Sequence, residues 1–207
     1  MDLDGILSHP LFLLIIGALV SGFIIPMVIN YLSNKWQKRQ KSLEIKIDLV
    51  TSISQTIMKI MTALELAESE INRFGKDIGT TDIGDNKYQK KSATKENYRK
   101  NIQQDFLKIE EEYREFKVSS AVIGTQFEGY FPSTNIKDCW DKITEKIKQL
   151  KDKVKQYSDL IERDFEKVQL SKEAVLIDSE LKEERAEILT KKMTMIRQVL
   201  NQSPYLG

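Results

Sequence analysis

The stretch LFLLIIGALVSGFIIPMVINYL, from Leu11 to Leu32, carries no charged residue over 22 consecutive positions. As an α-helix it would be ~33 Å long, which matches the hydrocarbon core of a lipid bilayer. A buried core helix is the alternative, but such helices rarely run this long without a charge. A cleaved signal peptide fits poorly, since Asp2 and Asp4 precede the run and large aliphatic residues fill it. The stretch therefore predicts a transmembrane helix over residues 11–32, with the lipid bilayer as a partner.

The flanks of this stretch predict how it is oriented. The only charged residues before the stretch are acidic, whereas four basic residues follow within ten positions of its end. Basic residues favour the cytoplasmic side, so residues 1–10 are expected outside the cell membrane and the C-terminal part in the cytoplasm. A single cysteine, Cys139, suits that reducing compartment. The expected membrane-interface anchor comprises Tyr31, Lys35, Trp36, Lys38, Arg39 and Lys41.

Small residues recur at helical spacing inside the apolar stretch. Gly17 with Ser21 and Ala18 with Gly22 form two overlapping pairs that would let two helix backbones approach closely. The alternative is that these residues simply face lipid. Pro26 removes one backbone hydrogen bond and is expected to kink the helix. These five positions are the candidates for packing within the membrane, including a homo-oligomer formed through the transmembrane helix.

Glycine and proline divide the rest of the chain into breaker-free stretches with helical periodicity. The predicted segments are a juxtamembrane basic segment with a first soluble helix (33–74), a distal loop (75–91), a second helix (92–123), an aromatic loop (124–135), a coiled-coil-like region (136–202) and a tail (203–207). In the first helix, apolar residues such as Leu43 and Val50 recur every seven positions, in two rows. No breaker separates Leu32 from Leu43, so this helix is expected to continue from the membrane.

The coiled-coil-like region holds a heptad pattern over about four repeats. One row comprises Trp140, Ile147, Val154, Ile161 and Val168, and the other Ile136, Ile143, Leu150 and Tyr157. The pattern leaves open whether residues 136–202 form one helix or a hairpin that breaks near Ser171 or Ser179. Typical helix lengths favour the hairpin.

These patterns together predict an all-α protein. A single N-terminal transmembrane helix would continue into an elongated cytoplasmic antiparallel bundle or coiled coil of three to four helices. No run of alternating β-branched residues suggests a sheet.

The composition argues against catalytic chemistry. The chain has 207 residues with 32 basic and 31 acidic side chains, hence a net charge of +1, and its acidic clusters alternate with Lys and Arg along helices. Its one histidine, His9, is expected across the membrane from Cys139, so no nucleophile–histidine pair can form within the chain. No phosphate-binding glycine motif is present. We therefore expect a protein that is not an enzyme and has no cofactor or metal.

Two local features stand above this background. Residues 87–100 contain six basic residues interleaved with tyrosines, which could form a patch for an anionic partner: Lys87, Lys90, Lys91, Lys95, Arg99 and Lys100. A solvated helix start is the plainer interpretation. The loop around Phe127, Tyr130 and Phe131 could contact a protein partner, lie at the membrane interface or cap the end of the bundle.

The sequence thus favours a single-pass membrane protein that acts by protein–protein interaction, as a tether, assembly subunit or signal transmitter, with a partner of unknown identity. The first alternative is a membrane-disrupting or pore-forming effector whose transmembrane helix oligomerises. The second is a membrane-tethered protein that contacts nucleic acid through residues 87–100, which the near-zero net charge makes the least favoured.

Overall fold

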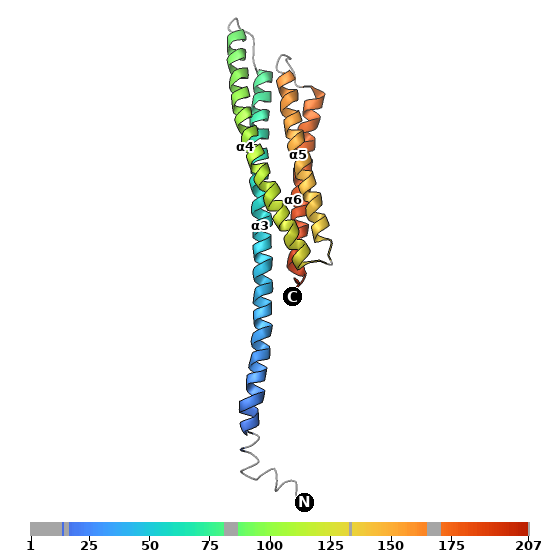
Figure 1. The fold of residues 1–207 in the computed structure, drawn as a ribbon. Coiled ribbons are helices and arrows are strands. Elements are labelled where there is room, and N and C mark those ends of the chain that lie inside the picture. The colour runs from blue at the N-terminus through green and yellow to red at the C-terminus, as the bar shows by residue number, and fades with distance from the viewer. Residues whose placement is uncertain (1–13, 15–16, 81–86, 133, 165–170, 207) are drawn as a thin grey trace, which may run out of the picture. The chain divides into compact units, whose positions relative to one another are not determined.

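The structure, a computed structural model, describes residues 14, 17–80, 87–132, 134–164 and 171–206. Every regular element among these residues is helical, which confirms the expected all-α class (Figure 1). The elements are a π-helical turn η1 (Val20–Ile24) and the α-helices α3 (Ile25–Thr80), α4 (Lys87–Tyr130), α5 (Ile136–Asp164) and α6 (Lys172–Asn201).

The chain divides into two compact units. The first extends to Ile45, and the second, here called the four-helix unit, comprises Lys46–Tyr205. Helix α3 belongs to both, since it runs without a break from Ile25 to Thr80. The continuity expected from the lack of glycine and proline between Leu32 and Leu43 is therefore present.

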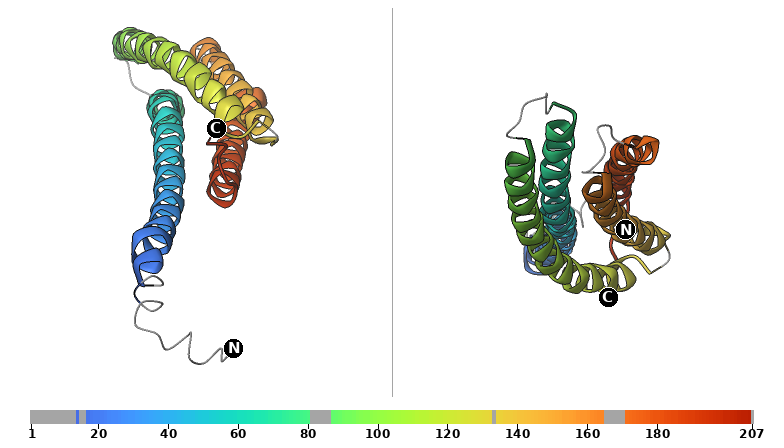
Figure 2. Two further views of the ribbon diagram at one scale, coloured as in Figure 1. Left: turned by 60° about the horizontal axis from the view of Figure 1, so that its bottom comes forward. Right: turned by 90° about the horizontal axis from the view of Figure 1, so that it is seen from above.

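Neighbouring helices of the four-helix unit run antiparallel. Between α3 and α4, Lys59 Nζ lies 3.1 Å from Glu115 Oε2. A residue later on α3, Phe74, contacts a residue earlier on α4, Tyr98, with ring centroids 3.9 Å apart. The two views of Figure 2 also show α5 and α6 side by side.

The remaining neighbours follow the same rule. Between α4 and α5, Lys151 Nζ lies 2.7 Å from Glu110 Oε1, and Arg99 Nε donates to Glu162 Oε1 at 2.6 Å. Between α5 and α6, Lys153 Nζ lies 2.7 Å from Glu184 Oε1. Helix α6 returns to α3, because Arg185 reaches Glu68 at 2.7 Å and Lys46 Nζ donates to Leu200 O at 2.8 Å. These contacts fit packing as an antiparallel bundle.

The heptad positions of residues 136–161 form the centre of this unit. Their described side chains are all buried, and Trp140, Ile143, Ile147, Leu150 and Val154 have no exposed surface. Val168, the last predicted position, lies outside the described residues. On α3 the two predicted apolar rows are buried from Ile53 onward, whereas Val50 is half-buried and Leu43 is 58% exposed and so lies outside the core.

Two helix ends differ from the sequence expectation. Helix α3 continues past Gly75 to Thr80, and α4 extends from Lys87 to Tyr130 instead of ending before Gly124. A glycine inside a helix costs only about 1 kcal/mol relative to alanine, which the tertiary contacts of a long helix can outweigh. Of the predicted distal loop, residues 75–80 and 87–91 are helical and residues 81–86 lie outside the described part, while the aromatic loop begins only after Tyr130.

The coiled-coil-like region is a hairpin. Helix α6 begins after Ser171, whose hydroxyl oxygen accepts a hydrogen bond from the backbone N–H of Ala174 at 3.2 Å. The backbone N–H of Ser171 in turn donates to Asp164 Oδ2 at 2.9 Å. The break thus lies at the first of the two predicted sites, and Ser179 is inside α6.

Candidate membrane span and interaction surfaces

By length and composition, the N-terminal helix could cross a membrane. None of its apolar window is buried within the protein, and residues 17–41 are all exposed. A core helix of a soluble domain would bury such side chains, so their exposure argues against that alternative.

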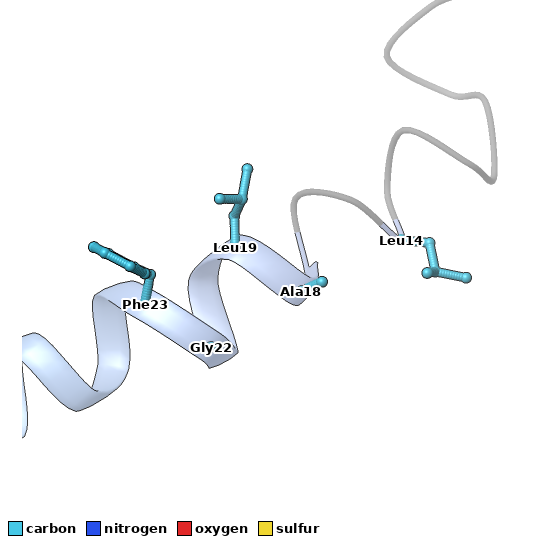
Figure 3. Close-up of a pocket in the computed structure, with 5 residues that line it drawn as sticks. All are labelled: Leu14, Ala18, Leu19, Gly22 and Phe23. Atoms are coloured by element: carbon cyan, nitrogen blue, oxygen red, sulfur yellow. The ribbon is translucent and has the colours of Figure 1, made fainter.

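The small residues of this helix leave a shallow apolar hollow on its surface. Figure 3 shows Ala18 and Gly22 among Leu14, Leu19 and Phe23, which line the hollow. A Cβ atom built at Gly17 or Gly22 would meet nothing within 4 Å. Packing within the chain therefore does not require glycine at either position.

The helix departs from α-geometry directly before Pro26. The backbone N–H of Ile25 bonds to Val20 O, five residues back, which defines the π-helical turn η1. Pro26 has no N–H, and its ring would crowd the carbonyl of Gly22, four residues back. The disturbance expected from Pro26 therefore takes the form of a π-turn. Ser21 is accommodated nearby because its hydroxyl donates to Gly17 O at 2.6 Å.

The predicted interface anchor lies along the first part of α3. All six of its side chains are exposed, including Tyr31 and Trp36 at 65% each. Its four cations, from Lys35 to Lys41, form no ion pair with any described residue. Their charge is thus available to anionic groups outside the chain.

The predicted basic patch is partly neutralised within the protein. Arg99 is paired with Glu162 of α5, and Lys100 Nζ lies 3.7 Å from Glu96 Oε1. Lys95 is half-buried near the start of α4. The side chains of Lys87, Lys90 and Lys91 lie outside the described part. The described residues therefore do not join into one open cationic surface.

Two of the three aromatic residues singled out in the sequence belong to the core. Phe127 is 1% exposed and packs edge-on against Trp140 with ring centroids 6.2 Å apart, and Phe131 is 4% exposed. Tyr130 is half-buried, and its carbonyl accepts a hydrogen bond from Tyr205 N at 2.7 Å. Of the three roles considered, capping the end of the bundle agrees best with this burial.

A polar cluster inside the four-helix unit was not predicted from the sequence. Tyr157 OH donates to Asn72 Oδ1 at 2.7 Å, and Asn72 Nδ2 donates to Asp178 Oδ1 at 3.1 Å. Tyr98 OH and Ser158 Oγ share a hydrogen bond of 2.9 Å. Each hydrogen bond joins residues of different helices, so no local sequence pattern signals the cluster.

Burial dominates the titration of this cluster. It raises the pKa of Tyr98 to about 12, and it raises the pKa of Tyr157 well above the ordinary value, with Asp178 and Glu68 adding to the shift. Burial also raises the pKa of Glu68, against the opposing charge of Arg185. Glu68 Oε2 has no hydrogen-bond partner among the described residues, so the ion pair with Arg185 is the main compensation for burying this carboxylate.

Two features of the described residues would indicate catalytic chemistry: a group of metal-binding side chains or a hollow that could hold a ligand. Among the described residues, no group of three His, Cys, Asp or Glu side chains could hold a metal ion. A small hollow between α3 and α4 is lined in part by Lys59 and Glu115, whose side chains form an ion pair with each other. No protein-family model, curated protein or solved structure matches this chain.

Proposed function

We propose that this chain is a single-pass membrane protein whose four-helix unit faces the cytoplasm and acts by non-enzymatic protein–protein interaction. Helix α3 carries the proposal: its first residues belong to the exposed apolar stretch, and from Leu49 onward it contributes side chains to the core. A continuous helix of this kind suits a tether or assembly subunit. It would also suit signal transmission, since a displacement at one end moves side chains at the other.

Orientation can be tested with cysteine labelling, because Cys139 is the one native cysteine. In a Cys139→Ser background, a cysteine is placed either at Ser203, which is exposed, or at Ser8. We expect a membrane-impermeant thiol reagent to label Ser203→Cys in inverted vesicles and Ser8→Cys in intact cells. The opposite pattern would reverse the orientation, and labelling of both variants in intact cells would contradict a membrane span.

Protein interaction can be tested in native membranes with a photo-reactive amino acid at exposed positions of different helices. Suitable sites are Leu107 on α4, Lys148 on α5 and Met193 on α6. We expect at least one site to give a discrete cross-linked product containing a second protein. Products that contain lipid alone, from every site, would contradict the proposal.

A membrane-disrupting effector is the second candidate, and the glycines of the apolar stretch favour it. Since Gly17 and Gly22 have open space around them, a partner helix could approach closely there. In this case Gly17→Leu with Gly22→Leu would abolish any loss of membrane potential on overexpression, without altering the four-helix unit. An unchanged potential with the native chain would remove this candidate.

A further inference from the structure

Apolar side chains lie along the line where α3 and α6 meet. Five are exposed and Ile196 is half-buried, and together they are called the α3–α6 strip below: Ile47 and Met58 on α3, and Leu189, Met193, Ile196 and Leu200 on α6. Ile47 is 61% exposed, Met58 51% and Met193 52%. The Lys46–Leu200 and Glu68–Arg185 contacts bracket these residues, so the two stretches lie alongside each other within the four-helix unit.

Helical spacing places both rows on the flanks that face each other. On α6 the row begins at Arg185, which reaches α3, and continues at intervals of four or three residues to Leu200. On α3, Met58 shares its row with Asn72 two heptads later, and Asn72 reaches Asp178 of α6. The apolar side chains therefore lie on neighbouring flanks of the two helices.

The charge beside the strip differs between its two helices. Residues 188–201 of α6 contain no acidic residue, whereas on α3 Glu44 and Asp48 lie within about one helical turn of Ile47. Earlier cations of α6 are paired with acids, as Arg185 is with Glu68 and Lys191 with Glu187. Lys192 and Arg197, beside the strip, have no ion-pair partner among the described residues. The α6 side of the strip is therefore apolar and flanked by cations alone.

We propose that the α3–α6 strip binds an amphipathic helix of a partner protein that carries acidic residues beside its apolar stripe. This inference rests on the proposed interaction function and names the surface and the class of partner. The strip spans ~16 Å along each helix, or about three turns, the length over which a helix presents anchors in a groove. Met58 and Met193 can adapt to the shape of such anchors.

Charge and composition favour this occupant over two others. A second copy that packed α6 against α6 would bring Lys192 and Arg197 against the same cations. A bilayer surface usually meets an interfacial segment through Trp or Phe, and the strip contains only aliphatic residues and methionine.

The test uses the full chain in nanodiscs of neutral lipid and two synthetic helices as probes. Each probe has three heptads with leucine at the a and d positions; one carries Glu at e and g, the other Lys. We expect the Glu probe to bind saturably and at least about tenfold more tightly than the Lys probe, as followed by fluorescence anisotropy. Equal affinity for both probes would overturn the proposal.

Variants then locate the contact. Leu189→Gln with Met193→Gln should weaken binding of the Glu probe about tenfold or more. The control pair Leu107→Gln with Val118→Gln, which is more exposed and lies on α4, should not weaken it. Lys192→Glu with Arg197→Glu should reverse the preference toward the Lys probe. Loss of binding in the α4 pair, or no reversal, contradicts the assignment.

Photo-cross-linking separates this proposal from the wider function. A partner captured from Leu107 or Lys148 but not from Met193 would keep the interaction function and overturn the strip. Dimers of the chain itself captured from Met193 would assign the strip to a second copy. If the strip variant loses binding to vesicles of equal phosphatidylcholine and phosphatidylglycerol but keeps the Glu probe, the strip is a bilayer contact and the proposal fails.

Discussion

At the scale of single residues, the ion pair between Glu68 and Arg185 should contribute strongly to stability. The Glu68 side chain is 4% exposed and that of Arg185 is 19% exposed. Arg185→Met leaves a buried carboxylate without its partner, so we expect the free energy of unfolding to fall by about 3 kcal/mol. Denaturant unfolding of the full chain in detergent, followed by circular dichroism, measures it.

The control for this prediction is Arg197→Met, an exposed position without an ion-pair partner among the described residues, which should change stability by at most about 0.5 kcal/mol. Adding Glu68→Leu to Arg185→Met should recover most of the loss, because the stranded charge is gone. If Arg185→Met were as stable as the control Arg197→Met, the Glu68 carboxylate would have to be solvated.

Tyr98 should make the four-helix unit sensitive to alkaline pH. Its pKa rises from the ordinary 10.0 to about 12 because the phenol is buried, so the folded state holds the proton more tightly than the unfolded state. The resulting stability is fully present below pH 10 and is lost between about pH 10 and pH 12, by roughly 3 kcal/mol.

The measurement compares the native chain with Tyr98→Phe across this range. At neutral pH the variant should be about 1 kcal/mol less stable, since the hydrogen bond to Ser158 is lost. Above pH 10 the difference in free energy of unfolding between the two chains should shrink and change sign, because only the native chain loses the stability that comes from the protonated Tyr98. A constant difference from pH 8 to pH 12 would show that Tyr98 titrates like an exposed tyrosine.

At the scale of elements, Ser171 defines the start of α6. Its hydroxyl is the N-cap acceptor, so Ser171→Ala should lower the free energy of unfolding by about 1 kcal/mol, while Ser171→Asp should retain the cap. Ser203→Ala, at an exposed residue beyond the helix, serves as the control. Equal effects at both serines would mean that the hydroxyl of Ser171 does not cap α6.

Glycines inside α4 give a second prediction at this scale. A Cβ at Gly129 would meet nothing within 4 Å, and one at Gly124 would make an ordinary 3.9 Å contact with Trp140. Alanine lowers the conformational entropy of the unfolded chain, so each substitution should stabilise the protein by about 0.5–1 kcal/mol. Thermal unfolding decides the matter: destabilisation by both alanines would favour a loop at these positions.

These two cases show what local sequence can predict about an element. The apolar periods predicted that helices exist and where their buried faces lie, and Ser171 was one of two candidate caps. The glycine positions predicted the ends of α3 and α4 wrongly. Glycine lowers helix stability only modestly, and tertiary contacts, which no local pattern contains, can outweigh that cost. The core contact of Phe127 with Trp140, for example, requires the neighbouring helix.

At the scale of the whole molecule, the sequence could not predict which distant residues contact each other. Nothing in the pattern links Asn72 to Tyr157 and Asp178, or Tyr98 to Ser158, since each partner comes from another helix. The α3–α6 strip has the same origin. Its two halves are separated by more than a hundred residues, and only the antiparallel return of α6 to α3 brings them together.

Self-association of the four-helix unit is the last property that follows from this packing. Heptad rows such as those of α5 can be satisfied within one chain or between chains. Here the described core positions of α5, from Ile136 to Ile161, are buried within a single chain. We therefore expect the fragment from Lys41 to Gly207 to be a helical monomer or a weak dimer. Light scattering over a range of concentrations measures this, and Leu189→Gln plus Met193→Gln tests whether any weak dimer forms through the strip. A stable tetramer that survives those substitutions would mean that the α5 rows pack between chains, and the assignment of the core to one chain would be wrong.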